Sequence, residues 1–185
     1  MELLETRLDG PKLIAPKVLA DQRGFFMETY RRNLFADLGI DEEMVQDNHS
    51  RSTAKIVRGM HFQIGAGAAK LVRCGRGSIY DVLVDLRKGS PSYGQWEGFE
   101  LTDENFHMLY CPIGFAHGFC VLSDVADVFY KQSNYYADET ERGISYRDPH
   151  VGIEWPIPVD ELIPSERDTN APTLAEIADG LPFTY

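Results

Sequence analysis

The sequence contains no run of about 18 apolar residues, so we expect no membrane-spanning helix. Its first residues, MELLETRLDGPKL, lack a basic segment followed by a long apolar one, and we therefore expect no signal peptide. Basic residues are few: 18 Lys and Arg stand against 29 Asp and Glu, a net charge of −11. This balance argues against a non-specific nucleic-acid binder, but a few cations gathered at one site could still hold an anionic small molecule.

Cysteine is also scarce. Cys74, Cys111 and Cys120 are odd in number and lack the CxxC spacing of a zinc site. We expect three reduced thiols in the core of a cytoplasmic protein, without a disulfide or a zinc centre.

Complete nucleotide-binding loops are absent. The stretch GAGAAK (65–70) has some letters of a dinucleotide-binding turn, but KLVRCGRGSIYD follows, with glycines where the helix of that motif should continue. No GxxxxGK[ST] phosphate loop occurs either. The sequence therefore predicts neither a nicotinamide nor a nucleoside-triphosphate site.

What the chain does have is many short strand-like runs separated by turns, within one domain spanning 1–185. The run IYDVLVDLR alternates cleanly between two faces, with Ile79, Asp81, Leu83 and Asp85 on one of them. Such runs favour an antiparallel sandwich or barrel. They cover residues 12–20, 23–30, 55–63, 70–77, 78–87, 96–102, 107–112, 116–123 and 127–136. Helices are expected only at 31–40, closed by Gly39, and within the C-terminal segment 170–185.

One of these runs, KIVRGMHFQI (55–64), has no cleanly apolar face. In a regular strand Arg58 would lie on one side and His61 with Gln63 on the other. Such a strand is either poorly buried or lines a polar cavity.

Residues suited to acid–base chemistry occur in four of the strand-like segments and near the C-terminus: His61, Lys70, His117, Tyr130 and, in SERD, Asp168. Each type also has an ordinary structural explanation. A single His in a strand is more often a satisfied polar residue than a catalyst, a Tyr among aromatics usually packs in the core, and a Lys that begins a strand usually lies at its rim.

The segment PIGFAHGF (112–119) resembles the PxGxxH element that supplies one metal-binding His in cupin barrels. A complete cupin metal site also needs an HxH pair, and the matching place here reads HFQ (61–63). We therefore expect a cupin-like barrel without a metal.

Nine segments together carry a more specific resemblance. They are DQRGFFMETY, QDNHSRS, VRGMHFQ, AKLVRC, DVLVDLRKGSPSYGQW, PIGFAHGF, VFYKQSNYY, RDP..GIEWP and SERDTNAPTL, and they run from about residue 10 to about residue 175. In this order they resemble the dTDP-4-dehydrorhamnose 3,5-epimerases, cupin-type enzymes of L-rhamnose biosynthesis. The resemblance implies a mainly β fold, a cupin-like jelly-roll barrel with short N- and C-terminal helices, acting as a homodimer without a cofactor.

The resemblance also implies roles for individual residues. His61 would be the base, Asp168 its partner, Tyr130 the acid, and Lys70 a cation near the enolate oxygen. The implied substrate-binding residues are His117 at the sugar, Arg58 and Arg167 at substrate and phosphates, Gln46, Asn48, Arg23 and Glu28 at the nucleotide, Tyr136 stacked on thymine, and Glu141. Arg23 and Glu28, in the segment 23–28, would reach over from the neighbouring subunit.

The implied reaction converts dTDP-4-dehydro-6-deoxy-D-glucose to dTDP-4-dehydro-L-rhamnose. Protons at C3 and C5 lie next to the C4 ketone, so a base on one face of the ring and an acid on the other can invert both carbons through an enolate. His suits the base because its pKa lies near neutrality.

Two expectations about geometry follow. Since the family places both Arg58 and His61 at the substrate, we expect a bulge near Gly59. Tyr130 and Tyr136, six residues apart, would face the same side of a regular strand.

Three alternatives remain open: an epimerase acting at C3 or C5 only, a non-catalytic cupin that binds a sugar nucleotide or acts as a sensor, and a metal-dependent cupin oxygenase or isomerase. The loop IGAGAAK departs from the Pro-containing loop usual in the family, which leaves the fine substrate preference undecided.

Overall fold

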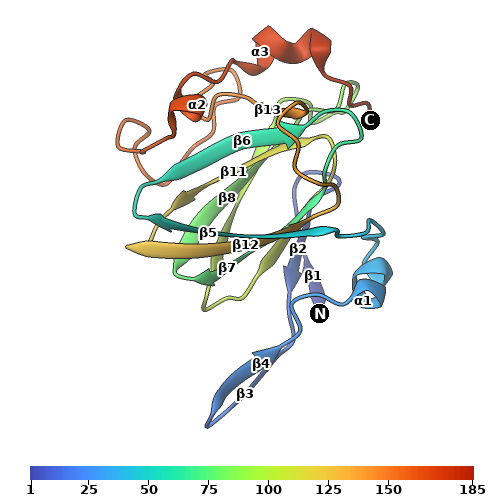
Figure 1. Ribbon diagram of the computed structural model, residues 1–185, viewed down its shortest axis with the longest axis vertical. Helices are drawn as coiled ribbons and strands as arrows, with labels where there is room; N and C mark the ends of the chain where they lie inside the picture. Colours follow the sequence, from blue (N-terminus) through green and yellow to red (C-terminus); the bar gives the residue numbers. More distant parts are fainter.

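The computed structural model describes residues 1–185 and consists of two antiparallel β-sheets packed face to face (Figure 1). One sheet has the order β1-β2-β10-β7-β12-β5, with bounds Glu2–Leu4, Lys12–Ala15, Met108–Cys111, Lys70–Arg76, Val125–Gln132 and Gln46–Thr53. The other has the order β13-β6-β11-β8-β9, with bounds Glu141–Gly143, Val57–Gln63, Phe115–Val121, Ser78–Asp85 and Trp96–Thr102. The predicted mainly β fold is confirmed.

Strand β8 shows how the alternating sequence builds the core. Ile79 and Leu83 face the six-stranded sheet and are fully buried between the sheets, as the period of two requires. Val82 and Val84 point to the opposite face, where the chain after β13 covers them, Leu174 included. Both faces of β8 are therefore buried.

The helices are short and lie outside the sheets. Helix α1 (Arg32–Asp37) falls within the predicted segment and buries Phe35 against the outer face of the six-stranded sheet. Helix α3 (Leu174–Ile177) continues into the turn η1 (Ala178–Gly180), and Thr173 caps it in a capping box with Glu176. The sequence did not predict α2 (Glu166–Thr169). No helix is long and apolar enough to cross a membrane.

Several predicted strands have different bounds: the run 23–30 keeps only Gly24–Met27, and two further differences have a clear physical reason. The run 12–20 divides into β2 and β3 (Val18–Asp21) around Pro16, which cannot donate to a strand ladder. The run 127–136 ends at Gln132, so Tyr136 lies beyond β12 and the expectation of one regular strand through both tyrosines was wrong. The side chain of Asn134 accepts a hydrogen bond from the Tyr135 amide (2.9 Å), a local bond that replaces the ladder.

Three strands were not predicted from the sequence. Strands β1 and β13 have only three residues each, and β5 reads QDNHSRST, without the apolar alternation that marks a half-buried strand. Strand β5 lies at the edge of its sheet, with one face toward a cavity and the other toward solvent. Because neither face packs in the core, polar residues can form this strand.

The expected bulge near Gly59 is confirmed. Along β11, His117 pairs with His61 but Phe119 pairs with Arg58, so β6 has one residue more than its partner over this stretch. The two backbones approach closely here, since a Cβ on Gly59 would lie 2.5 Å from Cα of Gly118. The extra residue changes the alternation and brings Arg58 and His61 to the same cavity.

Strands β3 and β4 (Gly24–Met27) form a separate hairpin that projects away from the two sheets (Figure 1). Its apolar side chains are unusually exposed: Leu19, Phe25 and Phe26 have 55%, 58% and 65% of their surface accessible. A projecting hairpin of this composition is typical of a surface that another chain covers.

Candidate active site

A cavity of about 480 Å³ opens between β6 and β11 of one sheet, β7 and β12 of the other, and the segment before α2. It has the size of a small-molecule site. Nine of the thirteen residues predicted from the sequence line it: His61, Tyr130, Asp168, Lys70, Arg58, His117, Tyr136, Glu141 and Arg167.

The His61 ring is held by a buried carboxylate. Its Nε2 lies 2.6 Å from Oδ1 of Asp168, and the Asp168 side chain is only 4% exposed. Burial by itself raises the pKa of Asp168. The hydrogen bond and the charge of His61, together with hydrogen bonds from Ser165 and Gly59, have a larger opposite effect, so the pKa of Asp168 is below its usual value. The carboxylate therefore stays ionised, orients the imidazole and leaves the other ring nitrogen for chemistry.

Asp168 reaches His61 from 107 residues away because the C-terminal segment is fixed to β6. Ile163 makes an isolated parallel bridge with Ile56, and its carbonyl accepts the Val57 amide at 3.1 Å. Ser165 then caps α2, its hydroxyl oxygen accepting the Asp168 amide at 3.1 Å. The helix start thus points the Asp168 carboxylate into the cavity wall.

Tyr130 lies on the other wall, since it belongs to β12 of the six-stranded sheet. Burial raises the pKa of the Tyr130 phenol, and the nearby Glu141 carboxylate raises it further, against a smaller opposing effect of Arg58. The phenol is therefore protonated at neutral pH and can donate a proton. A histidine and a tyrosine on facing sheets can approach a bound ring from opposite sides.

Three cations border the same cavity although the protein as a whole is strongly acidic: Lys70, Arg58 and Arg167. Nε of Arg58 donates to the Ser52 hydroxyl at 2.9 Å, which fixes the guanidinium at the rim. Arg167 lies 3.7 Å from Glu141, a loose ion pair that leaves donors free. This local excess of positive charge suits an anionic ligand.

A second His–carboxylate pair, which was not predicted from the sequence, lies deeper in the barrel. Nε2 of His117 is 3.0 Å from Oδ2 of Asp81, and the Asp81 side chain is fully buried. The signal was present: Asp81 shares a face with Ile79 and Leu83, and a charged residue on an apolar strand face requires a partner. Ser50 and Ser165 also line the cavity and were not predicted as site residues.

The structure places four predicted residues outside this cavity. Gln46 lies next to it, accepting the Tyr136 amide (2.9 Å) and donating to Asn48 (2.9 Å). Arg23, paired with Asp21, is at the tip of the projecting hairpin, and Glu28 lies 3.2 Å from Arg31. Neither Arg23 nor Glu28 reaches the cavity of its own chain.

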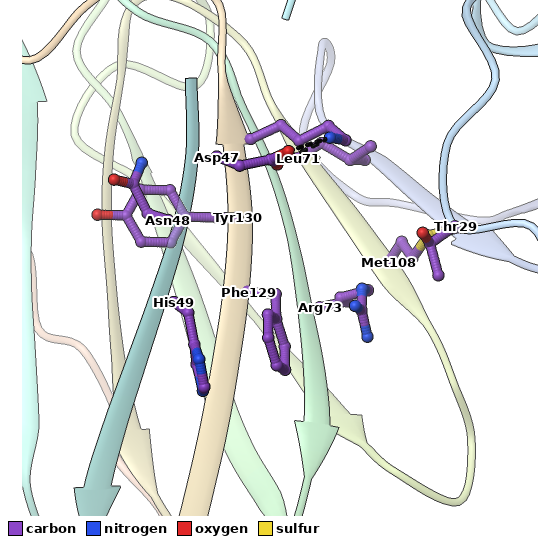
Figure 2. Close-up of a pocket in the computed structure, with 10 residues that line it drawn as sticks. Thr29, Asp47, Asn48, His49, Leu71, Arg73, Met108, Phe129 and Tyr130 are labelled. Atoms are coloured by element: carbon purple, nitrogen blue, oxygen red, sulfur yellow. Dashed lines mark hydrogen bonds and ion pairs between the residues drawn. The ribbon is translucent and has the colours of Figure 1, made fainter. Parts of the chain in front are cut away.

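Figure 2 shows a second hollow, of about 350 Å³, on the outer side of β5, β12 and β7. The Phe129 ring lies between His49 and Arg73. The centroids of the His49 and Phe129 rings are 4.2 Å apart, and the Arg73 guanidinium carbon lies 4.5 Å from the Phe129 centroid. Tyr130 borders both hollows, but His61 and Asp168 line only the inner cavity between the two sheets. We therefore assign the chemistry to the inner cavity.

A two-sheet β-barrel whose cavity carries a His–Asp pair opposite a protonated tyrosine defines an enzyme of the proton-transfer class. The family model described as dTDP-4-dehydrorhamnose 3,5-epimerase matches residues 5–176. The chain belongs to this family of carbohydrate epimerases, which are cupin-like β-barrel isomerases.

Individual relatives agree over nearly the whole chain. The dTDP-4-dehydrorhamnose 3,5-epimerase of Methanothermobacter thermautotrophicus is 48% identical over 174 residues, 94% of each chain. A dTDP-4-dehydrorhamnose 3-epimerase of Streptomyces niveus is 42% identical, covering 100% of this chain and 90% of its own. The crystal structure of dTDP-6-deoxy-D-glucose-3,5-epimerase from Legionella pneumophila, in complex with dTDP-4-keto-L-rhamnose, superimposes with a TM-score of 0.96 at 42% identity, covering 100% and 98% of the two chains.

Proposed function

We propose that this enzyme converts dTDP-4-dehydro-6-deoxy-D-glucose to dTDP-4-dehydro-L-rhamnose by inverting C3 and C5. The observation that carries the proposal is the His61–Asp168 pair facing Tyr130 across one cavity. In this proposal the single domain 1–185 supplies the base and the acid itself. The similarity to the Legionella epimerase, which was solved with dTDP-4-keto-L-rhamnose, supports the choice of sugar nucleotide.

The proposed chemistry moves only protons. His61 takes the proton from a carbon next to the C4 ketone, and the resulting imidazolium is stabilised by the Asp168 carboxylate. Negative charge then develops on the C4 oxygen, where the Lys70 ammonium stabilises it as a fixed cation inside the cavity. Tyr130 returns a proton from the opposite face, which inverts the carbon.

The reaction is tested by incubating the enzyme with the 4-keto substrate in deuterated water and locating the deuterium by NMR. Deuterium at both C3 and C5 of an L-configured product is expected. Incorporation at one carbon only would replace the proposal by a single-site epimerase, the activity named for the Streptomyces niveus relative. No incorporation at either carbon would favour a non-catalytic sugar-nucleotide binder.

Tyr136 is proposed to stack on the thymine ring, because it lines the cavity yet remains 49% exposed. Replacing it by alanine is expected to raise KM about 5- to 150-fold, the equivalent of the roughly 1–3 kcal/mol that base stacking contributes. Tyr136→Phe keeps the flat ring and should be nearly silent in steady-state kinetics. Tyr135→Ala is the matched control, since Tyr135 is 68% exposed and does not line the cavity. A large loss of kcat in Tyr136→Phe would contradict the stacking role.

A homodimer is proposed in which the β3–β4 hairpin, residues 23–28 included, covers the neighbouring active site. Two observations support it: the exposed Phe25 and Phe26 on the hairpin, and the position of Arg23 outside its own cavity. Arg23 and Glu28 would then complete the nucleotide site of the other subunit.

Mixing two inactive variants tests this arrangement. Each hybrid dimer of Arg23→Ala with His61→Ala has one site containing both His61 and a wild-type Arg23 from the other chain. Random subunit exchange is therefore expected to restore about a quarter of wild-type kcat/KM per chain. If Arg23 served its own chain, mixing would restore nothing, and sedimentation of the wild type as a monomer would also refute the proposal.

We further propose that the reaction needs no metal or other cofactor and takes place in the cytoplasm. Proton transfer next to a ketone requires no electron carrier. The three cysteines are free and buried, in keeping with a reducing compartment. Full activity is expected after exhaustive chelation, and a loss that a divalent metal restores would contradict the proposal.

A further inference from the structure

A compact group of metal-ligating side chains lies behind the proposed active site. Asp81 on β8, Cys111 at the end of β10 and His117 on β11 place their ligand atoms within 4.8 Å of one another. All three are buried, with 0%, 2% and 7% of their surface exposed. Because β10 belongs to one sheet and the other two strands to the facing sheet, the group spans the inside of the barrel.

The hydrogen bonding of this group is incomplete. His117 Nε2 bonds to Oδ2 of Asp81, whereas the buried Oδ1 has no hydrogen-bond partner although the same nitrogen lies 2.9 Å away. A buried carboxylate oxygen without a donor is costly. Oδ1 accepts no hydrogen bond, so it is available as a ligand atom for a cation.

We propose that Asp81, Cys111 and His117 form a binding site for a divalent metal ion of the zinc class. Carboxylate oxygen, thiolate sulfur and imidazole nitrogen are the three ligand types that zinc takes in proteins, and three protein ligands leave its fourth position open. With bonds of about 2.1 Å to nitrogen and 2.3 Å to sulfur, a tetrahedral ion holds these two atoms roughly 3.6 Å apart. The ligand atoms lie no more than 4.8 Å apart, so shifts on the order of 1 Å would bring them to this geometry.

Charge at the site agrees with a divalent ion. The Asp81 carboxylate and the Cys111 thiolate would together neutralise the two positive charges of the ion. Binding releases the proton of the Cys111 thiol, because the metal coordinates the thiolate. Affinity should consequently rise with pH.

The same site has a consequence for the epimerase, and this part rests on the proposed function. His117 lines the cavity, so an ion bound to it would share this side chain with the substrate. A bound ion takes His117 from the substrate and places a second cation beside Lys70. We expect the metal to inhibit the enzyme.

Cobalt(II), which occupies zinc sites and gives an intense thiolate-to-metal absorption band, reports binding without any activity measurement. Chelated wild-type protein titrated with Co²⁺ is expected to show this band at one ion per chain, and added Zn²⁺ should remove it. Cys111→Ala and Cys111→Val should lack the band and bind zinc more than about 10-fold more weakly, since even the loss of an outer partner of a ligand costs 10–100-fold. Cys74→Ala and Cys120→Ala, at the other two buried cysteines, are the matched controls and should keep the band.

The proposal is overturned if chelated wild type shows no cobalt–thiolate band, or if either Cys111 variant keeps it. In a parallel assay, zinc should inhibit wild type and leave Cys111→Ala active, and equal inhibition of both would refute the coupling to His117. A protein that binds cobalt at Cys111 but never exchanges substrate protons would contradict the proposed epimerase function alone.

Discussion

Replacing His61 by alanine is expected to lower kcat by at least about 100-fold, because a positioned general base contributes typically 10²–10⁴ in rate. His61 is the only imidazole in the cavity paired with a carboxylate of the C-terminal segment, at 2.6 Å from Asp168. Its loss removes the group that takes the proton, while Tyr130 and the cations of the cavity remain. Solvent deuterium exchange at C3 and C5, followed by NMR, measures the effect directly.

The stability of this variant must be checked, because it leaves the buried Asp168 carboxylate without its imidazole partner. A loss of about 1–3 kcal/mol in the free energy of unfolding is expected. His61→Gln keeps an amide donor near Asp168 and should recover stability without recovering activity. His49→Ala, on the outer face of the sheet, is the control histidine and should leave turnover unchanged. Near-wild-type exchange at both carbons in His61→Ala would exclude His61 as the base.

Tyr130→Phe is expected to remove the epimerised product, with turnover reduced by roughly 10²–10⁴. The variant keeps the ring that packs in the wall of the cavity and deletes only the hydroxyl. Since burial raises the pKa of the Tyr130 phenol, the wild-type group is a proton donor at neutral pH. His61 remains in the variant and can remove a proton and return a deuteron from the same face.

The signature of Tyr130→Phe is therefore exchange without inversion: deuterium enters the substrate, and its configuration is retained. Tyr80→Phe, on a strand face outside the cavity, is the control tyrosine. Full turnover in Tyr130→Phe together with inactivity of Tyr136→Phe would show that the two tyrosines have the opposite roles.

Much of this protein could be predicted from residues near one another in the sequence. The period of two in IYDVLVDLR predicts β8, and the turns between short apolar runs predict an antiparallel barrel, because strand and turn preferences act over a few residues. The order of nine motifs predicted the family, which the comparisons confirm. Strand β5 was missed because its residues are polar on both faces, and nothing local shows that one face borders a cavity.

The physical assembly of the cavity depends on tertiary structure, although the family resemblance already implied the Asp168–His61 pair and the bulge near Gly59. Arg58 and His61 share the cavity because β6 carries one extra residue opposite β11, and register is a property of the pair of strands. The pairings of Asp168 with His61 and of Asp81 with His117 join residues 107 and 36 positions apart. The sequence by itself determined which chemical groups are available and which strands carry them. The packing of the two sheets and the C-terminal segment determined which of these groups meet, because distances across a core depend on the whole fold.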